Sequence, residues 1–412
     1  MAAGRRSLLG GLAAGLASTA IPDESRAATP PRKTDDRIVI GALFPLTGPL
    51  AALGNECLRG VQLATDLCNA GGGLFGKQIN LVQGDAADAD RAVAAARSLI
   101  SDQQPSLIFG TGDSTLSLGA SEASEGSGIP YWELSATMPS VTTRGFHYLL
   151  RICDTENGVA DRAVEAAETL VAPALRRVPG SLTTTLLYSD SSSGMALLPL
   201  IAAAAQRRHM ALPTTIAYQS GDADFTAVAT RLGAMQPDVL IHHGSTEDVV
   251  LLHAALATRR WRPRAMIGTS SPYGSRNTAM MVGPALEGTL AVGVAPYSVD
   301  ARLAPDAAMV ATLYQQRFGA APRSGLSLSH FAGASLCFDA LRLAKTTDKD
   351  RVLNVVQGLG LAQGTLANGW GALFGPGGQN LRAFTSLAQW QGGRLVSLLP
   401  TDGASGRFRL RV

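Results

Sequence analysis

Short runs of β-branched residues alternate with Ala-rich amphipathic segments from Arg37 onward, and this alternation constrains the fold more than any other feature. The predicted strands are Ile38–Phe44, Ile79–Gln83, Leu107–Phe109, Ile129–Trp132, Thr184–Tyr188, Thr215–Tyr218, Val239–His242 and Ala265–Ile267. The predicted helices are Ala51–Asn69, Asp90–Ser101, Ser114–Glu125, Gly158–Leu170, Ser193–Arg207, Phe225–Ala234, Glu247–Ala257 and Ser275–Val282. Strands and helices in regular turn indicate parallel sheets with helices on both faces, so the sequence predicts an α/β fold.

The alternation breaks near His147–Asp154, where an extra strand and a polar stretch separate two series of similar length. A chain of 412 residues is long enough for two or three cores, at roughly 100–200 residues per domain. The break therefore predicts two lobes with a first crossing between them. The last third contains two predicted helices, Asp306–Phe318 and Leu328–Lys345, and an antiparallel pair, Phe384–Gln391 and Arg394–Leu398, joined by Gly392-Gly393.

The first 28 residues have the pattern of a signal peptide. Arg5 and Arg6 precede an apolar run from Leu8 to Ile21, and small residues follow near Ala27. The apolar run is shorter than the roughly 20 residues needed to cross a bilayer, so we expect export without membrane insertion. The Arg pair resembles a twin-arginine signal, although Gly4 stands where Ser or Thr is preferred, and the general secretory route stays open. Residues 29–36 are Pro-rich and polar and are predicted to form a flexible leader.

Charge and cysteine usage exclude some classes of protein. The 35 Lys and Arg are scattered among 32 Asp and Glu without a long run of one sign, so we expect no nucleic-acid partner. Cys57 and Cys68 fall on one predicted helix about 16 Å apart and cannot form a disulfide with one another. The state of Cys153 and Cys337 stays open, although small buried hydrophobes are the expectation for all four.

Motifs for catalysis and for metal or cofactor binding are weak in this sequence. Gly71–Gly76 matches G-x-G-x-x-G, but a helix precedes it and a strand follows, so a helix end and turn are predicted instead. No G-x-S-x-G motif occurs and no His has a place in a triad order. His242 and His243 are adjacent on a strand and point to opposite faces, which disfavours a shared metal. We therefore expect no enzyme activity, cofactor or metal.

Hydroxyl residues follow two of the predicted strands at their carboxyl ends, where ligands bind in open α/β sheets. The strand Leu107–Phe109 runs into a Gly-rich turn with Ser114 and Thr115 at the start of the next helix. These two side chains either contact a ligand or only cap the helix. The strand Ile129–Trp132 runs similarly into Ser135-Ala136-Thr137.

A series of motifs along the chain forms a recognisable pattern. They are Ile38-Val39-Ile40-Gly41, Pro45-Leu46-Thr47-Gly48, Asn69-Ala70-Gly71-Gly72, Gly110 with Ser114, Ser135-Ala136-Thr137 with Pro139, and Asp154-Thr155-Glu156-Asn157-Gly158. The pattern resembles the leucine/isoleucine/valine-binding protein family, the type I periplasmic solute-binding proteins of ABC transporters. The resemblance covers essentially the whole chain after the leader.

The resemblance implies two Rossmann-like lobes joined by three crossings, with lobe 1 formed by residues 37–153 and 290–367 and lobe 2 by residues 154–289 and 368–412. It further implies a monomer that clamps a small solute between the lobes, without chemistry, and delivers it to an ABC permease with its ATPase subunits. Family positions that hold a ligand carboxylate correspond to Ser114, Ser135 and Thr137, and a ligand-covering aromatic corresponds to Leu53. Lower-ranked candidates are Thr115, Ala136, Asp154, Ser193, His243, Ser245, Ser270 and Tyr273.

The sequence departs from the family where an α-ammonium group is expected to bind. Members that bind amino acids carry an acid just after the strand matching Ala265–Ile267, whereas this chain has Thr269-Ser270-Ser271. A buried ammonium without a carboxylate is unfavourable by several kcal/mol. We therefore expect discrimination against zwitterionic amino acids in favour of carboxylates or amides, unless Asp113 or Asp154 substitutes. The alternative function is a ligand-sensing regulatory protein of the same fold.

Overall fold

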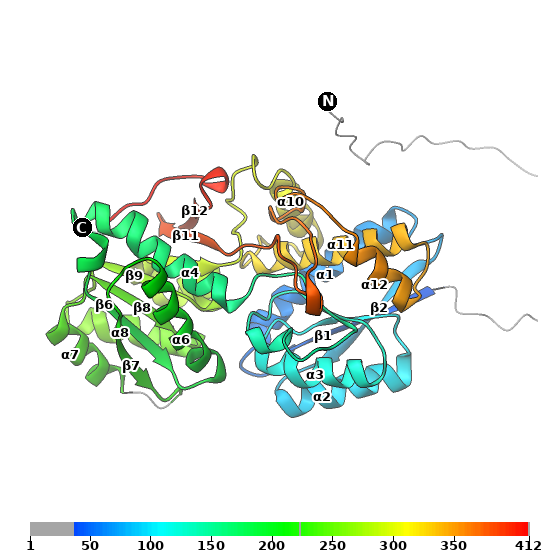
Figure 1. Ribbon diagram of the computed structural model, residues 1–412, viewed down its shortest axis with the longest axis horizontal. Helices are drawn as coiled ribbons and strands as arrows, with labels where there is room; N and C mark the ends of the chain where they lie inside the picture. Colours follow the sequence, from blue (N-terminus) through cyan, green and yellow to red (C-terminus); the bar gives the residue numbers. More distant parts are fainter. Residues whose placement is uncertain (1–36, 222–223, 411–412) are drawn as a thin grey trace, which may run out of the picture. The chain divides into compact units, whose positions relative to one another are not determined.

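The computed structural model describes residues 37–221 and 224–410, in which two sheets are each flanked by helices (Figure 1). The first sheet is parallel, with strand order β2-β1-β3-β4-β5. Its strands are β1 (Arg37–Phe44), β2 (Gln78–Asp85), β3 (Ile108–Gly110), β4 (Tyr131–Glu133) and β5 (Leu149–Arg151). This order reverses direction between β1 and β3, and such a switch point is where open α/β sheets bind ligands.

Helices from both ends of the chain pack on the first sheet. They are α1 (Ala51–Ala70), α2 (Ala89–Ser98), α3 (Ser114–Gly126), α10 (Ala307–Phe318), α11 (Leu326–Ala344) and α12 (Lys349–Gln357). Helix α11 lies against α1 although more than 250 residues separate them in the sequence (Figure 1). A Cβ atom on Gly60 of α1 would lie 2.3 Å from the carbonyl oxygen of Ser327, so only glycine permits this close approach.

The second sheet has the order β12-β11-β10-β9-β8-β6-β7. Its parallel strands are β6 (Thr184–Ser189), β7 (Thr214–Tyr218), β8 (Val239–His243), β9 (Ala265–Gly268) and β10 (Leu290–Gly293). The hairpin of β11 (Ser386–Gln391) and β12 (Arg394–Leu399) adds antiparallel strands at one edge. Its helices are α4 (Glu156–Ala166), α5 (Ala172–Ala174), α6 (Ser192–Arg207), α7 (Phe225–Met235), α8 (Thr246–Thr258) and α9 (Arg276–Val282).

Short turns of other helix types complete the described elements. They are π turns η1 (Leu99–Gln103) and η3 (Ala167–Val171), and 3₁₀ turns η2 (Pro139–Val141), η4 (Pro179–Ser181), η5 (Ser271–Gly274), η6 (Gly283–Leu286), η7 (Pro376–Gly378) and η8 (Thr401–Gly403). Each of the two sheets has its own hydrophobic core. The predicted α/β fold is confirmed, with two sheets of mostly parallel strands.

Two predicted turns and the cysteine expectation also agree with the structure. After α1 the chain turns through Gly72, Gly73 and Gly76, all with positive φ, before β2 begins, so the glycine motif is a helix end and not a nucleotide site. Gly392 and Gly393 have φ of 60° and 73°, as a tight hairpin turn requires. All four cysteines are buried and free.

The lobe boundaries predicted at residues 290 and 368 are wrong. Strand β10 pairs with β9 and β11, so residues 290–293 belong to the second sheet and not to lobe 1. Trp370, Ala372 and Phe374 pack in the core of the first sheet, and the chain enters the second sheet only with β11. The chain still passes three times between the sheets, after β5, after β10 and before β11.

Candidate functional site

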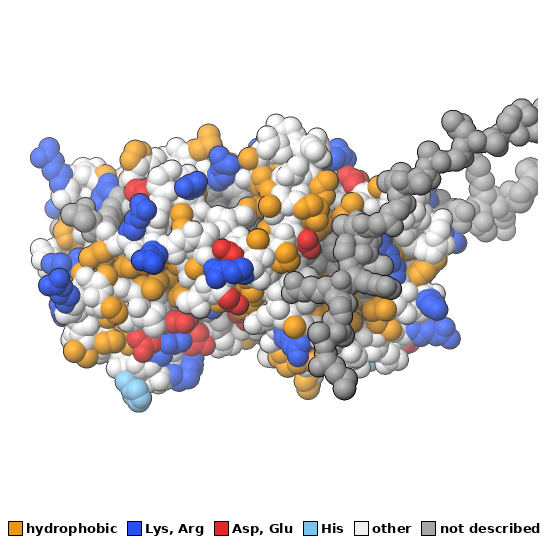
Figure 2. Space-filling model, turned by 90° about the horizontal axis from the view of Figure 1, so that it is seen from above, with side chains coloured by type: hydrophobic (Ala, Val, Ile, Leu, Met, Phe, Trp, Pro, Cys, Tyr) orange, Lys and Arg blue, Asp and Glu red, His pale blue; other side chains and the backbone are white. Residues whose placement is uncertain are grey.

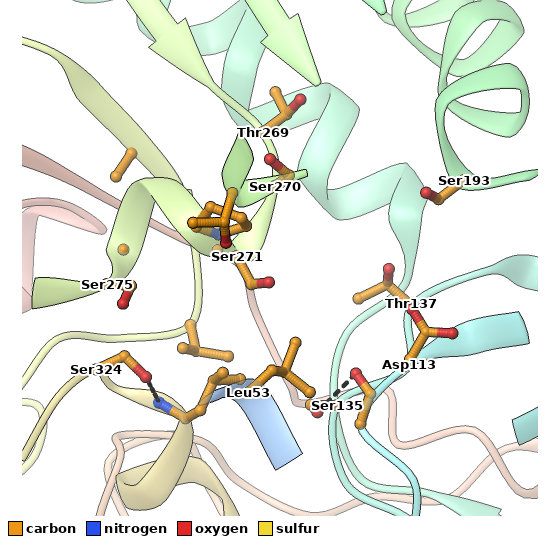
Figure 3. Close-up of a pocket in the computed structure, with 18 of the residues that line it drawn as sticks. Leu53, Asp113, Ser135, Thr137, Ser193, Thr269, Ser270, Ser271, Ser275 and Ser324 are labelled. Atoms are coloured by element: carbon orange, nitrogen blue, oxygen red, sulfur yellow. Dashed lines mark hydrogen bonds between the residues drawn. The ribbon is translucent and has the colours of Figure 1, made fainter. Parts of the chain in front are cut away.

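A cavity of about 800 Å³ lies between the loops that follow the strands of both sheets. Ten of the predicted site residues line it: Leu53, Ser114, Thr115, Ser135, Thr137, Asp154, Ser193, His243, Ser245 and Ser270. Figure 3 shows Asp113, Ser135 and Thr137 on one side of this space and Ser270, Ser271 and Ser275 on another, with Leu53 between them. The size is typical of a small-molecule site.

The loops after β3 and β4 form the wall contributed by the first sheet, because these two parallel strands are neighbours. Asp113 caps α3 by accepting the backbone N–H groups of Thr115 and Leu116 at 2.9 and 3.2 Å. The Ser114 hydroxyl accepts the N–H of Met138 at 3.1 Å and so links the two loops. Gly112 has a φ of +85°, which favours glycine in this turn.

The Glu133 carboxylate at the end of β4 forms hydrogen bonds with both loops. It accepts the N–H of Thr111 at 2.9 Å, those of Ser135 and Ala136 at 2.9 and 2.8 Å, and the Ser117 hydroxyl. The side chain is fully buried, and this burial raises the pKa of Glu133, although the hydrogen bonds act in the opposite direction. These backbone donors are therefore occupied within the protein, which leaves the side-chain hydroxyls of the wall to face a ligand.

Thr137 is the least engaged of these hydroxyls. Among the described residues, its side chain has no hydrogen-bond partner, and it is half-buried at the cavity wall. The Ser135 hydroxyl makes only long contacts, 3.4 Å to the carbonyl of Gly112 and 3.5 Å to His330 Nε2. Both hydroxyls retain donor capacity for a ligand oxygen.

The second sheet contributes a chain of polar groups centred on His243. Its Nε2 lies 3.1 Å from the Ser193 hydroxyl, and its Nδ1 lies 3.2 Å from the Thr269 hydroxyl. Burial lowers the pKa of His243 to about 4, so the imidazole is neutral at pH 7. Next to it, His242 points into the core and contacts the Tyr218 and Tyr273 hydroxyls. The predicted opposite orientation of the two histidines is confirmed.

The contact between Ser193 and His243 does not have the properties of a nucleophilic pair. A catalytic histidine is normally held by a carboxylate that stabilises its charged form, whereas His243 contacts the neutral hydroxyl of Thr269. With a pKa of about 4, it is also a weak base at pH 7. The geometry is suited to hydrogen bonding of a polar solute.

Two serines tie the loops of the second sheet together while lining the cavity. Ser270 donates its hydroxyl to the carbonyl of Gly244 at 2.7 Å, which links the loops after β8 and β9. Ser245 caps α8 in a reciprocal pair with Asp248. Both hydroxyls thus have structural partners in addition to their position at the cavity.

Two predicted site residues lie outside the cavity lining. Tyr273 is fully buried because η5 turns its ring inward against Gly268, where a Cβ atom would come within 1.9 Å of the ring. Ala136 is also buried, and it packs in the core near Leu43 and Tyr131. Of the predicted ligand-binding residues, Tyr273 and Ala136 thus have no side chain at the cavity.

The crossings between the sheets form the floor of the cavity. Asp154, on the first crossing, accepts the Thr385 hydroxyl of the third crossing at 2.8 Å. Its other oxygen accepts the N–H of Thr155 at 2.7 Å. Burial raises the pKa of Asp154, partly offset by these bonds. Asp154 is therefore engaged in joining two crossings.

Several residues that line this floor are not among the predicted site residues. Glu156, Trp370 and Phe384 are among them, and Glu56 lines the first-sheet wall. Glu156 belongs to the Asp154–Gly158 motif, so its place near the first crossing could be inferred from the sequence. Its burial could not. Trp370 and Phe384 come from a late segment that the predicted boundary assigned to the other lobe.

On the face shown in Figure 2, Lys and Arg side chains are dispersed among uncharged ones, with Asp and Glu beside several of them. In the described part of the chain, no group of three or more His, Cys, Asp and Glu side chains is placed to hold a metal ion. No helix within residues 37–221 and 224–410 has the length and apolar character of a membrane span. The predicted signal peptide and leader lie outside the described residues.

Comparisons with known proteins agree on one family. The model of the periplasmic binding protein family matches residues 37–394. Leu/Ile/Val-binding protein homolog 8 of Brucella abortus (strain 2308) is 33% identical over 375 residues, which cover 91% of this chain and 93% of that protein.

Solved structures show the same fold at low sequence identity. The branched-chain amino acid transporter substrate-binding protein LivJ from Streptococcus pneumoniae, in complex with isoleucine, has a TM-score of 0.73 at 19% identity, covering 88% of this chain and 99% of that one. An ABC transporter solute-binding protein from Rhodopseudomonas palustris BisB5, in complex with 3,4-dihydroxybenzoic acid, has a TM-score of 0.72 at 17% identity, covering 90% and 98%. The same architecture thus accommodates ligands with and without an ammonium group.

Proposed function

The chain belongs to the periplasmic binding protein family, and from this premise we propose that it is the solute-binding component of an ABC importer of the branched-chain amino acid type. It captures a small polar solute, amino acid-like, carboxylate or amide, in the cavity between the two sheets. The observation that carries this proposal is the cavity itself, lined by hydroxyls from both sheets and floored by the crossings. The relatives' names support transport over the regulatory alternative.

Binding requires donors that are held ready before the ligand arrives. The hydroxyls of Ser135 and Thr137 offer hydrogen bonds to a carboxylate or carbonyl from one side, while Ser193 and His243 offer them from the other. Leu53 provides apolar contact at the start of α1. Because the two walls belong to different sheets, rotation about the crossings brings them onto the solute, and the closed form is the one recognised by the permease.

The remaining parts of the proposal concern location and partners. The family is periplasmic, and the Arg5-Arg6 pair with its apolar run supports export by the twin-arginine or the general secretory route. The partners are the solute and an ABC permease with its ATPase subunits, and the protein acts as a monomer without turning over its ligand.

The proposal predicts stabilisation and compaction by a ligand. Thermal unfolding is measured with leucine, isoleucine, valine, 4-methylpentanoate, short amides and 3,4-dihydroxybenzoate. A compound present at 100 times its Kd stabilises the folded state by about 2.7 kcal/mol. X-ray scattering of the same mixture should give a smaller radius of gyration, and the compound should be recovered chemically unchanged. An unfolding temperature and scattering profile that no compound alters would contradict the proposed function.

Thr137→Val tests the hydroxyl wall directly. Valine keeps the shape of threonine but removes a hydroxyl that has no partner among the described residues, so the free energy of unfolding should change by less than about 0.5 kcal/mol. Affinity for the stabilising compound should fall about 10- to 100-fold, as expected when a hydrogen bond to a charged group is lost. Thr312→Val, on the exposed face of α10, is the matched control. Unchanged titration heats in the Thr137 variant would remove this residue from the site.

A further inference from the structure

Glu156 differs from every other carboxylate at the cavity. It lies in the first turn of α4, lines the cavity, and is only 2% exposed. Its Oε2 atom is buried without a hydrogen-bond partner, and no described residue donates to its other oxygen. Buried polar groups are nearly always hydrogen-bonded, and an unpaired buried carboxylate is especially unfavourable. An unmet acceptor at this place indicates a missing donor.

The other acidic side chains around the cavity are hydrogen-bonded within the protein or, in the case of Glu247, exposed to solvent. Glu56 accepts the Tyr314 and Ser327 hydroxyls at 2.7 and 2.6 Å and two backbone N–H groups. Asp154 accepts the Thr385 hydroxyl with one oxygen and the N–H of Thr155 with the other, and Asp113 caps α3. Asp113 and Asp154 were the substitutes that the sequence suggested for the absent acid near Ser270. Among the acids that line the cavity, Glu156 is the one that is buried and has a carboxylate oxygen without a hydrogen-bond partner in the described part of the chain.

The charge of Arg151 acts on Glu156, but the two side chains form no ion pair in the described part of the chain. Arg151 is 1% exposed and donates to Gln379, to the Thr142 hydroxyl and to the carbonyls of Ala136 and Met138. Among the described residues it forms no ion pair with a carboxylate. Burial raises the pKa of Glu156 to about 7, although the charge of Arg151 acts to lower it. The floor of the cavity thus lacks a positive charge in contact with this carboxylate.

Resting on the proposed function, we propose that Glu156 binds the ammonium group of an amine-bearing solute and so sets the specificity of the site. The N–H of Glu156 donates to the carbonyl of Thr137 at 2.8 Å, which places the backbone of Glu156 beside the wall that offers hydroxyls to a carboxylate. An α-amino acid carries its ammonium and carboxylate on one carbon atom, so acceptors and donors for it must be close together. Glu156, in the first turn of α4, and Thr137, in the loop after β4, line the same cavity and are joined by this backbone bond.

Isothermal titration with leucine and with 4-methylpentanoate, its des-amino analogue, tests the assignment. Glu156→Gln keeps the size of the side chain and removes its charge. The variant should lose about 100-fold in affinity for leucine, since a buried charge loses its partner. It should bind 4-methylpentanoate at least as well as the unmodified protein does. Glu165→Gln, on the same helix but outside the cavity lining, should change neither affinity more than about threefold.

The outcomes separate this assignment from the broader function. The role of Glu156 would be overturned if Glu156→Gln lost affinity equally for both compounds, or if it lost no affinity for leucine. An unmodified protein that binds 4-methylpentanoate or 3,4-dihydroxybenzoate but neither leucine, isoleucine nor valine would overturn it too, while the solute-binding function stands. A protein that binds none of these compounds and carries no small molecule when purified from its host would overturn both. Circular dichroism of each variant confirms folding.

Discussion

Glu133→Ala is expected to destabilise the protein by about 3–5 kcal/mol in urea-induced unfolding. The substitution leaves the N–H groups of Thr111, Ser135 and Ala136 and the Ser117 hydroxyl without their acceptor. Each unsatisfied buried donor is unfavourable by about 1–3 kcal/mol, reduced where water enters the space left by the side chain. Because this carboxylate holds the loops after β3 and β4, ligand affinity should fall as well.

Two further variants show whether hydrogen bonding is the cause. Glu133→Gln retains one oxygen acceptor but turns an NH₂ group toward donors, so we expect it to lose about half as much stability as the alanine variant. Glu122→Ala, an exposed position on α3, should change the free energy of unfolding by less than about 0.5 kcal/mol. A loss below about 1 kcal/mol for Glu133→Ala would mean that the backbone alone holds these loops.

The order of strands and helices could be predicted because buried parallel strands and amphipathic helices have different hydrophobic periods. Strand β10 could not be predicted in this way, because Leu290-Ala291-Val292-Gly293 has only three apolar residues after a turn. Its conformation comes from pairing with β9 on one side and β11 on the other. Such pairing overrides weak local preference, and the missed strand also caused the misplaced boundary at residue 290.

Site residues could be predicted where they follow the rule that ligands bind at the carboxyl ends of parallel strands. They could not be predicted where their position depends on tertiary packing. Ser114, Ser135 and Thr137 follow strands at their carboxyl ends, so their position at the cavity could be inferred from the sequence. Tyr273 follows β9 equally closely, but the turn η5 directs its ring toward His242. Glu156 lines the same cavity as Trp370 and Phe384, which lie more than 200 residues away in the sequence. No local pattern carries that information.

The unmet acceptor also predicts a pH-dependent stability that needs no ligand. The pKa of Glu156 is raised by burial from 4.5 to about 7 in the folded protein. Above pH 7 the carboxylate is ionised in both folded and unfolded chains, and the folded state bears the full penalty, about 3 kcal/mol. Below pH 4.5 it is protonated in both, and the penalty is absent. Glu156→Gln should therefore be more stable than the unmodified protein by up to about 3 kcal/mol at pH 8, and equally stable near pH 4.

Comparing the two proteins at each pH removes the contribution of other titrating groups. The buried histidines His243, His253 and His330 have pKa values lowered to about 4, so both proteins lose stability as the pH falls from 6.5 toward 4. Asp154 and Arg151, the charged groups on the adjoining crossing and strand, are present in both. The difference in free energy of unfolding thus reports on Glu156. A difference that stays constant between pH 4 and 8 would show that water reaches the carboxylate. A difference that grows with pH would show that the ionised carboxylate is buried. If leucine then stabilises only the unmodified protein and removes the difference, the carboxylate binds a cationic group of the ligand.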